Sequence, residues 1–322
     1  MNRIVNRRKF LGTLGVAGLA GKGLMAYSLA GESAPAGNRK MTICLVCGAI
    51  GVSANQVQAI DLASRHGFEA VEAYGGYLAS LSETQLQDLL AQMKAKGIVF
   101  GAAGLPVDFR QDDARFAEGM KGLPLLAAGL KRAGVDRMGT YLMSGHSTLT
   151  YLQNFKQHAA RLRQAAEVLK DHGVRLGFEY VGTKTLRDTR RYPFIHTMAE
   201  TRELIAEIGL NNVGFVLDSW HWHCARETPA DILTLKNEQI ISVDLNDAPD
   251  GIPVEQLIDN RRELPTATGV IDVGAFLNAL RQVGYDGPVR AEPFNKALND
   301  LPNEEACAAT AQAMKRAFAV LQ

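Results

Sequence analysis

The sequence predicts a single (β/α)8 barrel that follows a short N-terminal export segment. From Met41 onward, short apolar runs alternate with longer amphipathic stretches, which is the pattern of repeated βα units around a parallel sheet. Eight such runs fall within about 280 residues, a length typical of a closed barrel. No linker-like stretch interrupts residues 41–322, so we expect residues 37–322 to form one domain.

Eight apolar runs are expected to form the strands of the barrel. They are Thr42–Val46, Ala70–Tyr74, Val99–Ala103, Arg137–Leu142, Arg175–Tyr180, Gly214–Asp218, Ile240–Asp244 and Pro288–Glu292. The stretches between them carry helix signals, such as the cap at Ser82, the run Tyr151–Asp171 before Gly173, and Val273–Val283 before Gly284. An Ala-rich helix over Glu304–Leu321 is expected to close the ring.

A doubly wound open sheet is the rival architecture. Such a sheet has a glycine-rich turn after its first strand, and Gly48-Ala49-Ile50-Gly51 matches that turn only in part. The number of βα repeats therefore favours the barrel.

Residues 1–36 are expected to be a twin-arginine signal peptide and linker. Arg7-Arg8-Lys9-Phe10-Leu11 is followed by a Gly/Ala-rich apolar stretch, and small residues at Ala30 or Ala36 offer cleavage positions. The apolar stretch is too short for a stable membrane span. We therefore expect a periplasmic protein that is carried by the twin-arginine export machinery.

Composition argues against a nucleic-acid partner and against a disulfide framework. The chain has 35 Lys plus Arg and 34 Asp plus Glu, a formal net charge of +1, whereas nucleic-acid binders usually carry a basic excess. Its four cysteines are too few to staple a fold of this size. The sequence leaves the oligomeric state open, a homo-oligomer included.

Carboxylates end the last four predicted strands, at Glu179, Asp218, Asp244 and Glu292. In a barrel these strand ends converge on the face that carries the active site. Four buried carboxylates repel one another unless a cation lies between them. Oxygen ligands suit Mn²⁺ or Mg²⁺, and Co²⁺ or Zn²⁺ remain alternatives. The competing interpretation is that each acid only caps the helix that follows it.

At these residues the sequence resembles the xylose-isomerase-like TIM barrel superfamily, which includes ketose 3-epimerases, inosose dehydratases, hydroxypyruvate isomerase and the endonuclease IV group. The resemblance is clearest over Asp244–Asp272, which looks like proteins of the sugar phosphate isomerase/epimerase family. It implies that Glu179, Asp218, Asp244 and Glu292 are metal ligands. The family usually has His where this chain has Asp244, so Asp247 or His221 could take that role instead.

Four further residues are candidates for substrate binding. Asp218-Ser219-Trp220-His221 matches the family's Asp-x-x-His element, in which the His contacts a substrate oxygen. Trp220 offers an apolar face for a sugar ring. Arg262, before the Leu-Pro turn, resembles the substrate-contacting Arg of the epimerases, and Glu72 ends the second predicted strand. The competing interpretation is an ordinary structural or solvated role for each of them.

The leading hypothesis is a metal-dependent sugar isomerase or epimerase. Glu179 and Glu292 would flank a small sugar or keto-sugar, one removing a proton next to the carbonyl and the other returning it, while the metal stabilises the enediolate. A lyase, dehydratase or hydratase acting on keto-sugars or glycosides is the alternative. A non-catalytic periplasmic sugar-binding protein and an endonuclease IV-like nuclease are the other two classes considered. The loop over residues 182–196 could form a lid.

Overall fold

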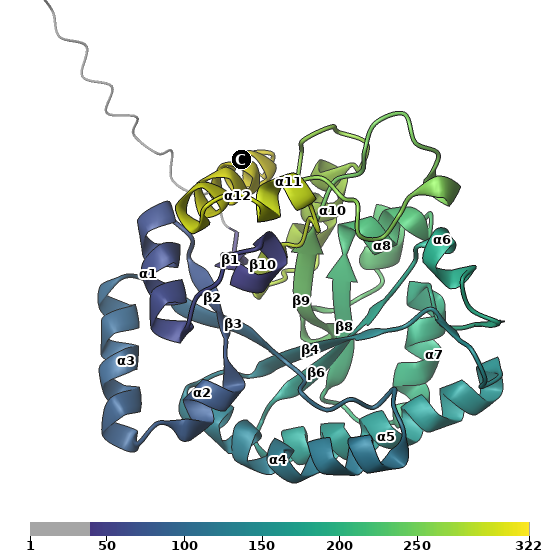
Figure 1. The fold of residues 1–322 in the computed structure, drawn as a ribbon, viewed down its shortest axis with the longest axis horizontal. Coiled ribbons are helices and arrows are strands. Elements are labelled where there is room, and N and C mark those ends of the chain that lie inside the picture. The colour runs from purple at the N-terminus through teal and green to yellow at the C-terminus, as the bar shows by residue number, and fades with distance from the viewer. Residues whose placement is uncertain (1–38, 322) are drawn as a thin grey trace, which may run out of the picture. The chain divides into compact units, whose positions relative to one another are not determined.

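The computed structural model describes residues 39–321, and a closed barrel of eight parallel strands forms its centre (Figure 1). The predicted signal peptide lies outside the described residues. In order around the barrel the strands are β1 (Thr42–Leu45), β2 (Ala70–Ala73), β3 (Val99–Gly104), β4 (Arg137–Leu142), β6 (Arg175–Tyr180), β8 (Val213–Asp218), β9 (Ile240–Leu245) and β10 (Pro288–Ala291). The predicted fold class is confirmed, and the expected strand limits agree to within one residue.

Strand register decides which of the strand-end residues become neighbours. Between β8 and β9, Asp218 pairs with Asp244, and between β9 and β10, Asp244 pairs with Arg290. On the other side of β6, Tyr141 of β4 pairs with Glu179. The carboxylates of four successive strands are therefore brought to one end of the barrel.

Helices surround the barrel, and their starts follow local capping chemistry. The longer ones are α1 (Gln56–His66), α3 (Glu83–Ala95), α4 (Asp113–Arg132), α5 (Tyr151–Asp171), α7 (Met198–Ile208), α10 (Val273–Gln282) and α12 (Asn303–Ala319). Ser82 and Thr150 each form a capping box with the Gln three residues later. The shorter ones are α2 (Gly75–Ser80), α6 (Lys184–Arg187), α8 (Ser219–Cys224), α9 (Pro229–Ile232) and α11 (Lys296–Asn299).

The last helix completes the ring, as the sequence predicts. Helix α12 contacts α1, α10 and β10, and Figure 1 shows it next to α1. Its buried face is built from small residues together with Met314 and Phe318. None of the described helices is both long and apolar enough to cross a bilayer.

Two connecting segments are longer than the rest. Residues 182–196, expected as one long loop, contain α6 and the short strand β7 (Tyr192–Pro193), which pairs antiparallel with β5 (Gly145–His146). The segment between β9 and α10 is held by Asp247, whose carboxylate accepts backbone N–H bonds from Ala248, Thr268, Gly269 and Ile271 at 2.7–2.9 Å. Asp247 therefore serves as the anchor of this segment.

Candidate active site and metal centre

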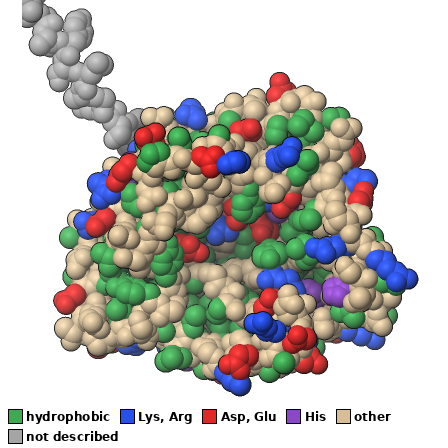
Figure 2. Space-filling view, in the orientation of Figure 1, with side chains coloured by type: hydrophobic (Ala, Val, Ile, Leu, Met, Phe, Trp, Pro, Cys, Tyr) green, Lys and Arg blue, Asp and Glu red, His purple; other side chains and the backbone are tan. Residues whose placement is uncertain are grey.

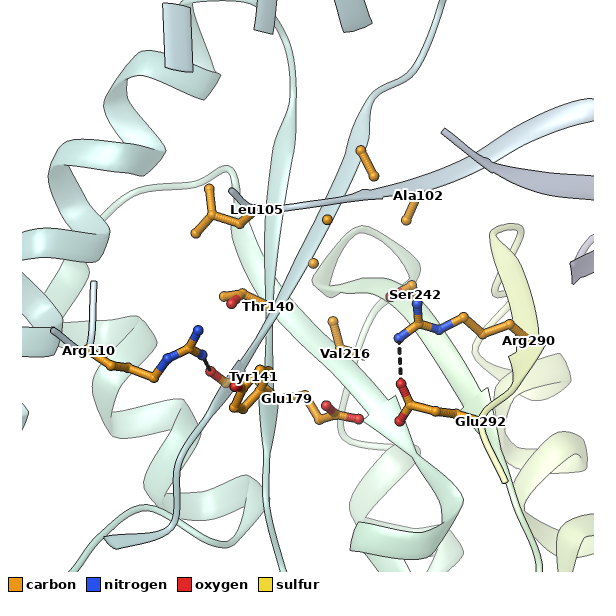
Figure 3. A pocket seen from close by; sticks show the side chains of 13 residues that line it. Ala102, Leu105, Arg110, Thr140, Tyr141, Glu179, Val216, Ser242, Arg290 and Glu292 are labelled. Atoms are coloured by element: carbon orange, nitrogen blue, oxygen red, sulfur yellow. Dashed lines mark hydrogen bonds and ion pairs between the residues drawn. The ribbon is translucent and has the colours of Figure 1, made fainter. Parts of the chain in front are cut away.

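A cavity of about 230 Å³ opens at the carboxyl end of the barrel. Figure 2 shows this face hollowed near its centre, with acidic, basic and histidine side chains gathered around the hollow. Small residues from β3 and β4 form one wall, and Glu179, Ser242, Arg290 and Glu292 line the opposite side. Figure 3 shows Glu179 and Glu292 pointing toward each other across it.

The structure brings the four predicted carboxylates together. Glu179 is on β6, Asp218 and Asp244 are on β8 and β9, and Glu292 directly follows β10. Each offers an oxygen, and these oxygens all lie within 4.8 Å of one another. Such a spacing allows one ion to be shared, which is the geometric condition for the predicted metal site.

Asp218 is held by three donors. Its Oδ1 accepts bonds from the backbone N–H of Trp220 at 2.7 Å and from Asn246 Nδ2 at 2.8 Å, while Arg262 Nη1 donates to Oδ2 at 2.7 Å. The same Arg262 nitrogen lies 3.3 Å from Glu292 Oε2. Because Asp218 and Arg262 are both buried, this charge-assisted pair fixes the position of the carboxylate.

Asp244, which stands where the family usually has His, is paired with Arg290. Arg290 donates through Nε to Oδ1 and through Nη2 to Oδ2, the latter at 2.9 Å. The contact is a two-point pair between a guanidinium and a carboxylate, a geometry that holds both groups rigidly. Arg290 also approaches Glu292 Oε1 at 3.4 Å, so it joins two of the predicted ligands.

Glu179 and Glu292 are the carboxylates whose protonation is most perturbed. Burial, followed by the charges of Glu292, Asp244 and Asp218, raises the pKa of Glu179 well above its usual value. Burial and the charge of Asp244 raise the pKa of Glu292 to about 8. The Oε1 atom of Glu179 is buried without a hydrogen-bond partner. Glu292 is therefore suited to exchange a proton near neutral pH, and the raised pKa of Glu179 favours its protonated form.

The donor set is consistent with a divalent cation. When all groups are ionised, four carboxylates face two guanidiniums, which leaves two negative charges in excess before the flanking Glu72 and Asp259 are counted. The orphaned Glu179 oxygen offers a ligand that nothing else uses. Glu179, Asp218 and His221 form a second possible ligand group, whereas Asp247 is committed to backbone bonds.

The candidate substrate-binding residues lie behind the carboxylates rather than on the cavity wall. Trp220 is 0% exposed, and its indole N–H donates to Thr183 Oγ1 at 2.9 Å, with the Arg262 guanidinium over its ring. His221 is buried beside Arg262. Burial, followed by the positive charge of Arg262, lowers the pKa of His221 to about 3. Burial raises the pKa of Glu72, which the positive charge of Arg290 opposes. Their direct contact with substrate stays a prediction.

Several residues that shape the site were missed by sequence reasoning. Asp259 accepts from Arg262 through its backbone oxygen at 2.8 Å and through Oδ1 at 3.0 Å, and thereby orients the guanidinium. Arg290 could have been found, because it lies two residues before Glu292 on one strand and so shares its face. Tyr141 and Arg110, which line the cavity, carried no comparable signal.

The chain is similar in sequence to proteins whose activities are named. It is 23% identical over 256 residues to an inosose isomerase of Bacillus velezensis, covering 79% of this chain and 88% of that protein. It is 30% identical over 142 residues to a 3-dehydroshikimate dehydratase of Pseudomonas aeruginosa, covering 44% of this chain but only 21% of that protein. The first likeness spans most of both proteins at low identity, and the second is confined to part of each.

Solved structures give the same fold. A xylose isomerase domain protein from Alicyclobacillus acidocaldarius superposes with a TM-score of 0.76 at 30% identity, covering 87% of this chain and 99% of that one. The IOLI protein, solved with a bound zinc atom, superposes at 0.71 with 22% identity, covering 87% and 98%. The sequence profile of the xylose isomerase-like TIM barrel family matches residues 60–317, so the chain belongs to this family.

Proposed function

We propose that this protein is a divalent-metal-dependent isomerase or epimerase of a small sugar or keto-sugar, which moves a proton at a carbon next to a carbonyl. The observation that carries the proposal is the pair Glu179 and Glu292. The two side chains face each other across the cavity, and the pKa of each is raised (Figure 3). The likeness to an inosose isomerase supports an isomerase of this fold.

The two glutamates divide the proton transfer between them. One carboxylate removes the proton next to the carbonyl, and the electron pair moves onto the carbonyl oxygen to give an enediolate. The other, as the carboxylic acid, returns a proton to the opposite face of the same carbon for epimerisation. For isomerisation it protonates the former carbonyl carbon instead, while the proton of the neighbouring hydroxyl passes to the former carbonyl oxygen, so that the hydroxyl-bearing carbon becomes the new carbonyl. Raised pKa values let both groups change protonation state during turnover.

The remaining charged residues position these two. Arg262 holds Asp218 and Glu292, and Arg290 holds Asp244 and Glu292, so the four carboxylates keep a fixed arrangement. Glu179, Asp218, Asp244 and Glu292 would hold the metal, which when bound supplies positive charge to stabilise the enediolate. We propose Mn²⁺ or Mg²⁺ for this all-oxygen set, with Zn²⁺ or Co²⁺ as alternatives.

Isotope exchange in D₂O tests this proposal. Free sugars and keto-sugars with added Mn²⁺ should show deuterium entering at one carbon by NMR. The variants Glu179→Gln and Glu292→Gln should each lower the exchange rate by at least 10²-fold. The exposed Glu203→Gln variant on α7 is the matched control. Normal exchange in either active-site variant, with metal bound, would rule out the paired-carboxylate mechanism.

A second candidate function is elimination. The likeness to a 3-dehydroshikimate dehydratase favours it, since the same proton removal followed by loss of a β-oxygen substituent gives an unsaturated ketone. Such a product absorbs in the ultraviolet, and its appearance without epimer or isomer would select the lyase.

We further propose export to the periplasm by the twin-arginine route, on the strength of Arg7-Arg8 and the apolar stretch after them. Replacing both arginines by lysine should retain the protein in the cytoplasmic fraction. Equal periplasmic amounts of the two forms would contradict this assignment.

A further inference from the structure

A second cavity of about 280 Å³ adjoins the first one. Arg110 and Tyr141 line both cavities, so the two share a wall. The rest of the second cavity is lined by Asp108 and Gln111, by residues of the segment from Met143 to Ser147, by Asn154 and His158 of α5, and by Arg190. None of these residues belongs to the carboxylate cluster, and the proton-transfer mechanism does not use them.

Two buried polar atoms beside this cavity have no hydrogen-bond partner among the described residues. They are Asn154 Oδ1 and His158 Nε2, on residues that are each 2% exposed. His158 Nδ1 lies 2.9 Å from the backbone oxygen of Asn154, so Nδ1 carries the proton and Nε2 is an acceptor. Burial lowers the pKa of His158 to about 3, which keeps the ring neutral.

Two unfilled acceptors on residues that line one cavity favour a ligand that brings donors. A buried acceptor without a donor is costly, and native proteins rarely keep two side by side without a purpose. Hydroxyl groups meet this need. The oxygens of a ligand carboxylate are acceptors and cannot donate a hydrogen bond to Asn154 Oδ1 or His158 Nε2. These two atoms therefore favour a neutral hydroxylated ligand over an anion.

The shared wall suits a sugar. Tyr141 is 43% exposed, and the Arg110 guanidinium lies 4.0 Å from the centre of its ring. Arg110 is fixed in turn by donating to the backbone oxygen of Tyr141 at 2.7 Å, a bond visible in Figure 3. The boundary between the cavities is therefore a fixed aromatic and guanidinium surface, against which a ring can pack.

We propose that the second cavity binds a second hydroxylated ring joined to the reacting sugar, so that the substrate class is a keto-sugar glycoside or disaccharide rather than a free monosaccharide. The identity of the reacting ring rests on the proposed function, but the existence of the subsite does not. In this arrangement the first cavity holds the reacting ring beside the carboxylates. The second cavity holds the ring that is joined to the reacting one.

Equilibrium binding to the full-length protein tests the subsite independently of turnover. The probes are D-fructose and two disaccharides that contain fructose, isomaltulose and lactulose, titrated calorimetrically in the presence of Mn²⁺. At least one disaccharide should bind about tenfold more tightly than fructose, the gain of one or two additional hydrogen bonds. Magnetisation transfer to protons of its second ring should also appear by NMR.

Two variants remove the unfilled acceptors one at a time. Asn154→Leu and His158→Phe should each abolish the tighter binding of the disaccharide and leave the affinity for fructose unchanged. The Phe ring in His158→Phe retains the packing against Phe109 and Phe194. Asn278→Leu on α10, which also replaces a helical Asn, is the matched control and should keep the preference.

Other binding results would contradict the proposed subsite. Equal binding of all three sugars, or binding of none, removes the case for a second ring, and so does a preference that survives in both variants. Tighter binding of a glucuronyl ketose than of its neutral counterpart would assign the cavity to an anion. If the preference holds but no deuterium exchange occurs, the proton-transfer function fails and the subsite stands.

Discussion

The two halves of the barrel supply different things to the same cavity. In the first half, β3 and β4 bring small residues to its wall, among them Ala103, Gly104 and Gly139, whereas β6 to β10 in the second half bring four carboxylates and Arg290. The backbone scaffold is the same in both halves. Buried charges require fixed partners, so the second half carries the arginine network, while the first half leaves open space for a ligand.

The largest expected effect comes from removing a charge partner in the second half. Arg262→Ala should lower the free energy of unfolding of metal-free protein by about 3–5 kcal/mol, because Asp218 then remains buried without its guanidinium partner and Glu292 keeps only Arg290. Urea denaturation monitored by circular dichroism measures it. The exposed neighbour Arg261→Ala is the control. Similar midpoints for the two variants would show that the network contributes no stability.

The first half should be sensitive to acid through His158. Its pKa is held at about 3 by burial, against an ordinary value of 6.5, so the folded protein binds this proton poorly. The contribution of neutral His158 to stability is complete above pH 6.5 and decreases as pH falls toward 3. Between pH 7 and 4 the loss should be about 3 kcal/mol, and His158→Phe should remove it. An unchanged pH profile in the variant would contradict this assignment.

Glu227, which follows α8 in the second half, should respond with the opposite sign. Burial raises its pKa from 4.5 to about 7, although Tyr180 and the backbone N–H of Met198 donate to it. The folded state binds this proton more tightly, so the contribution of Glu227 to stability is greatest below pH 4.5 and decreases as pH rises to 7. Glu227→Gln should remove a slope on the order of 2 kcal/mol over this range. Glu203→Gln should behave as the wild type, and a slope that persists in Glu227→Gln would contradict the assignment.

The smallest effects on stability should come from Gly→Ala substitutions, which add one methyl group. These effects should again differ between the two halves of the barrel. At Gly177 on β6 an added Cβ would lie 2.7 Å from Ile241 Cβ, so Gly177→Ala should cost about 1–3 kcal/mol. At Gly104 on β3 an added Cβ meets nothing within 4 Å, so Gly104→Ala should change stability by less than about 0.5 kcal/mol. Thermal unfolding of the two variants measures these costs. An equal loss of stability in both would contradict the inference that the wall at Gly104 has open space.

The strands and most helices follow from local sequence. Apolar runs between turn residues mark each strand, and Ser82 and Thr150 mark helix starts through capping boxes, so these elements need no long-range information. The convergence of Glu179, Asp218, Asp244 and Glu292 also follows, because parallel strands of a barrel direct their carboxyl ends to one face.

The partners of those carboxylates were not accessible from the sequence. Asp244 and Arg290 are 46 residues apart and meet because of strand register. Trp220, expected to support a sugar ring, is directed inward by the short helix α8 and lies against Arg262. The orientation of a side chain on a single helical turn depends on how that turn packs, which no periodic pattern specifies.

Sequence alone thus determined the barrel, its eight strands and the acidic residues at their ends, since these depend on chain-local periodicity and on a fixed strand direction. Only the tertiary structure decided which arginine neutralises which carboxylate, that Asp247 anchors a connecting segment, and that a second cavity with unfilled acceptors adjoins the first. Pairing of buried charges depends on distances between side chains that are remote in the chain, and those distances are set by packing.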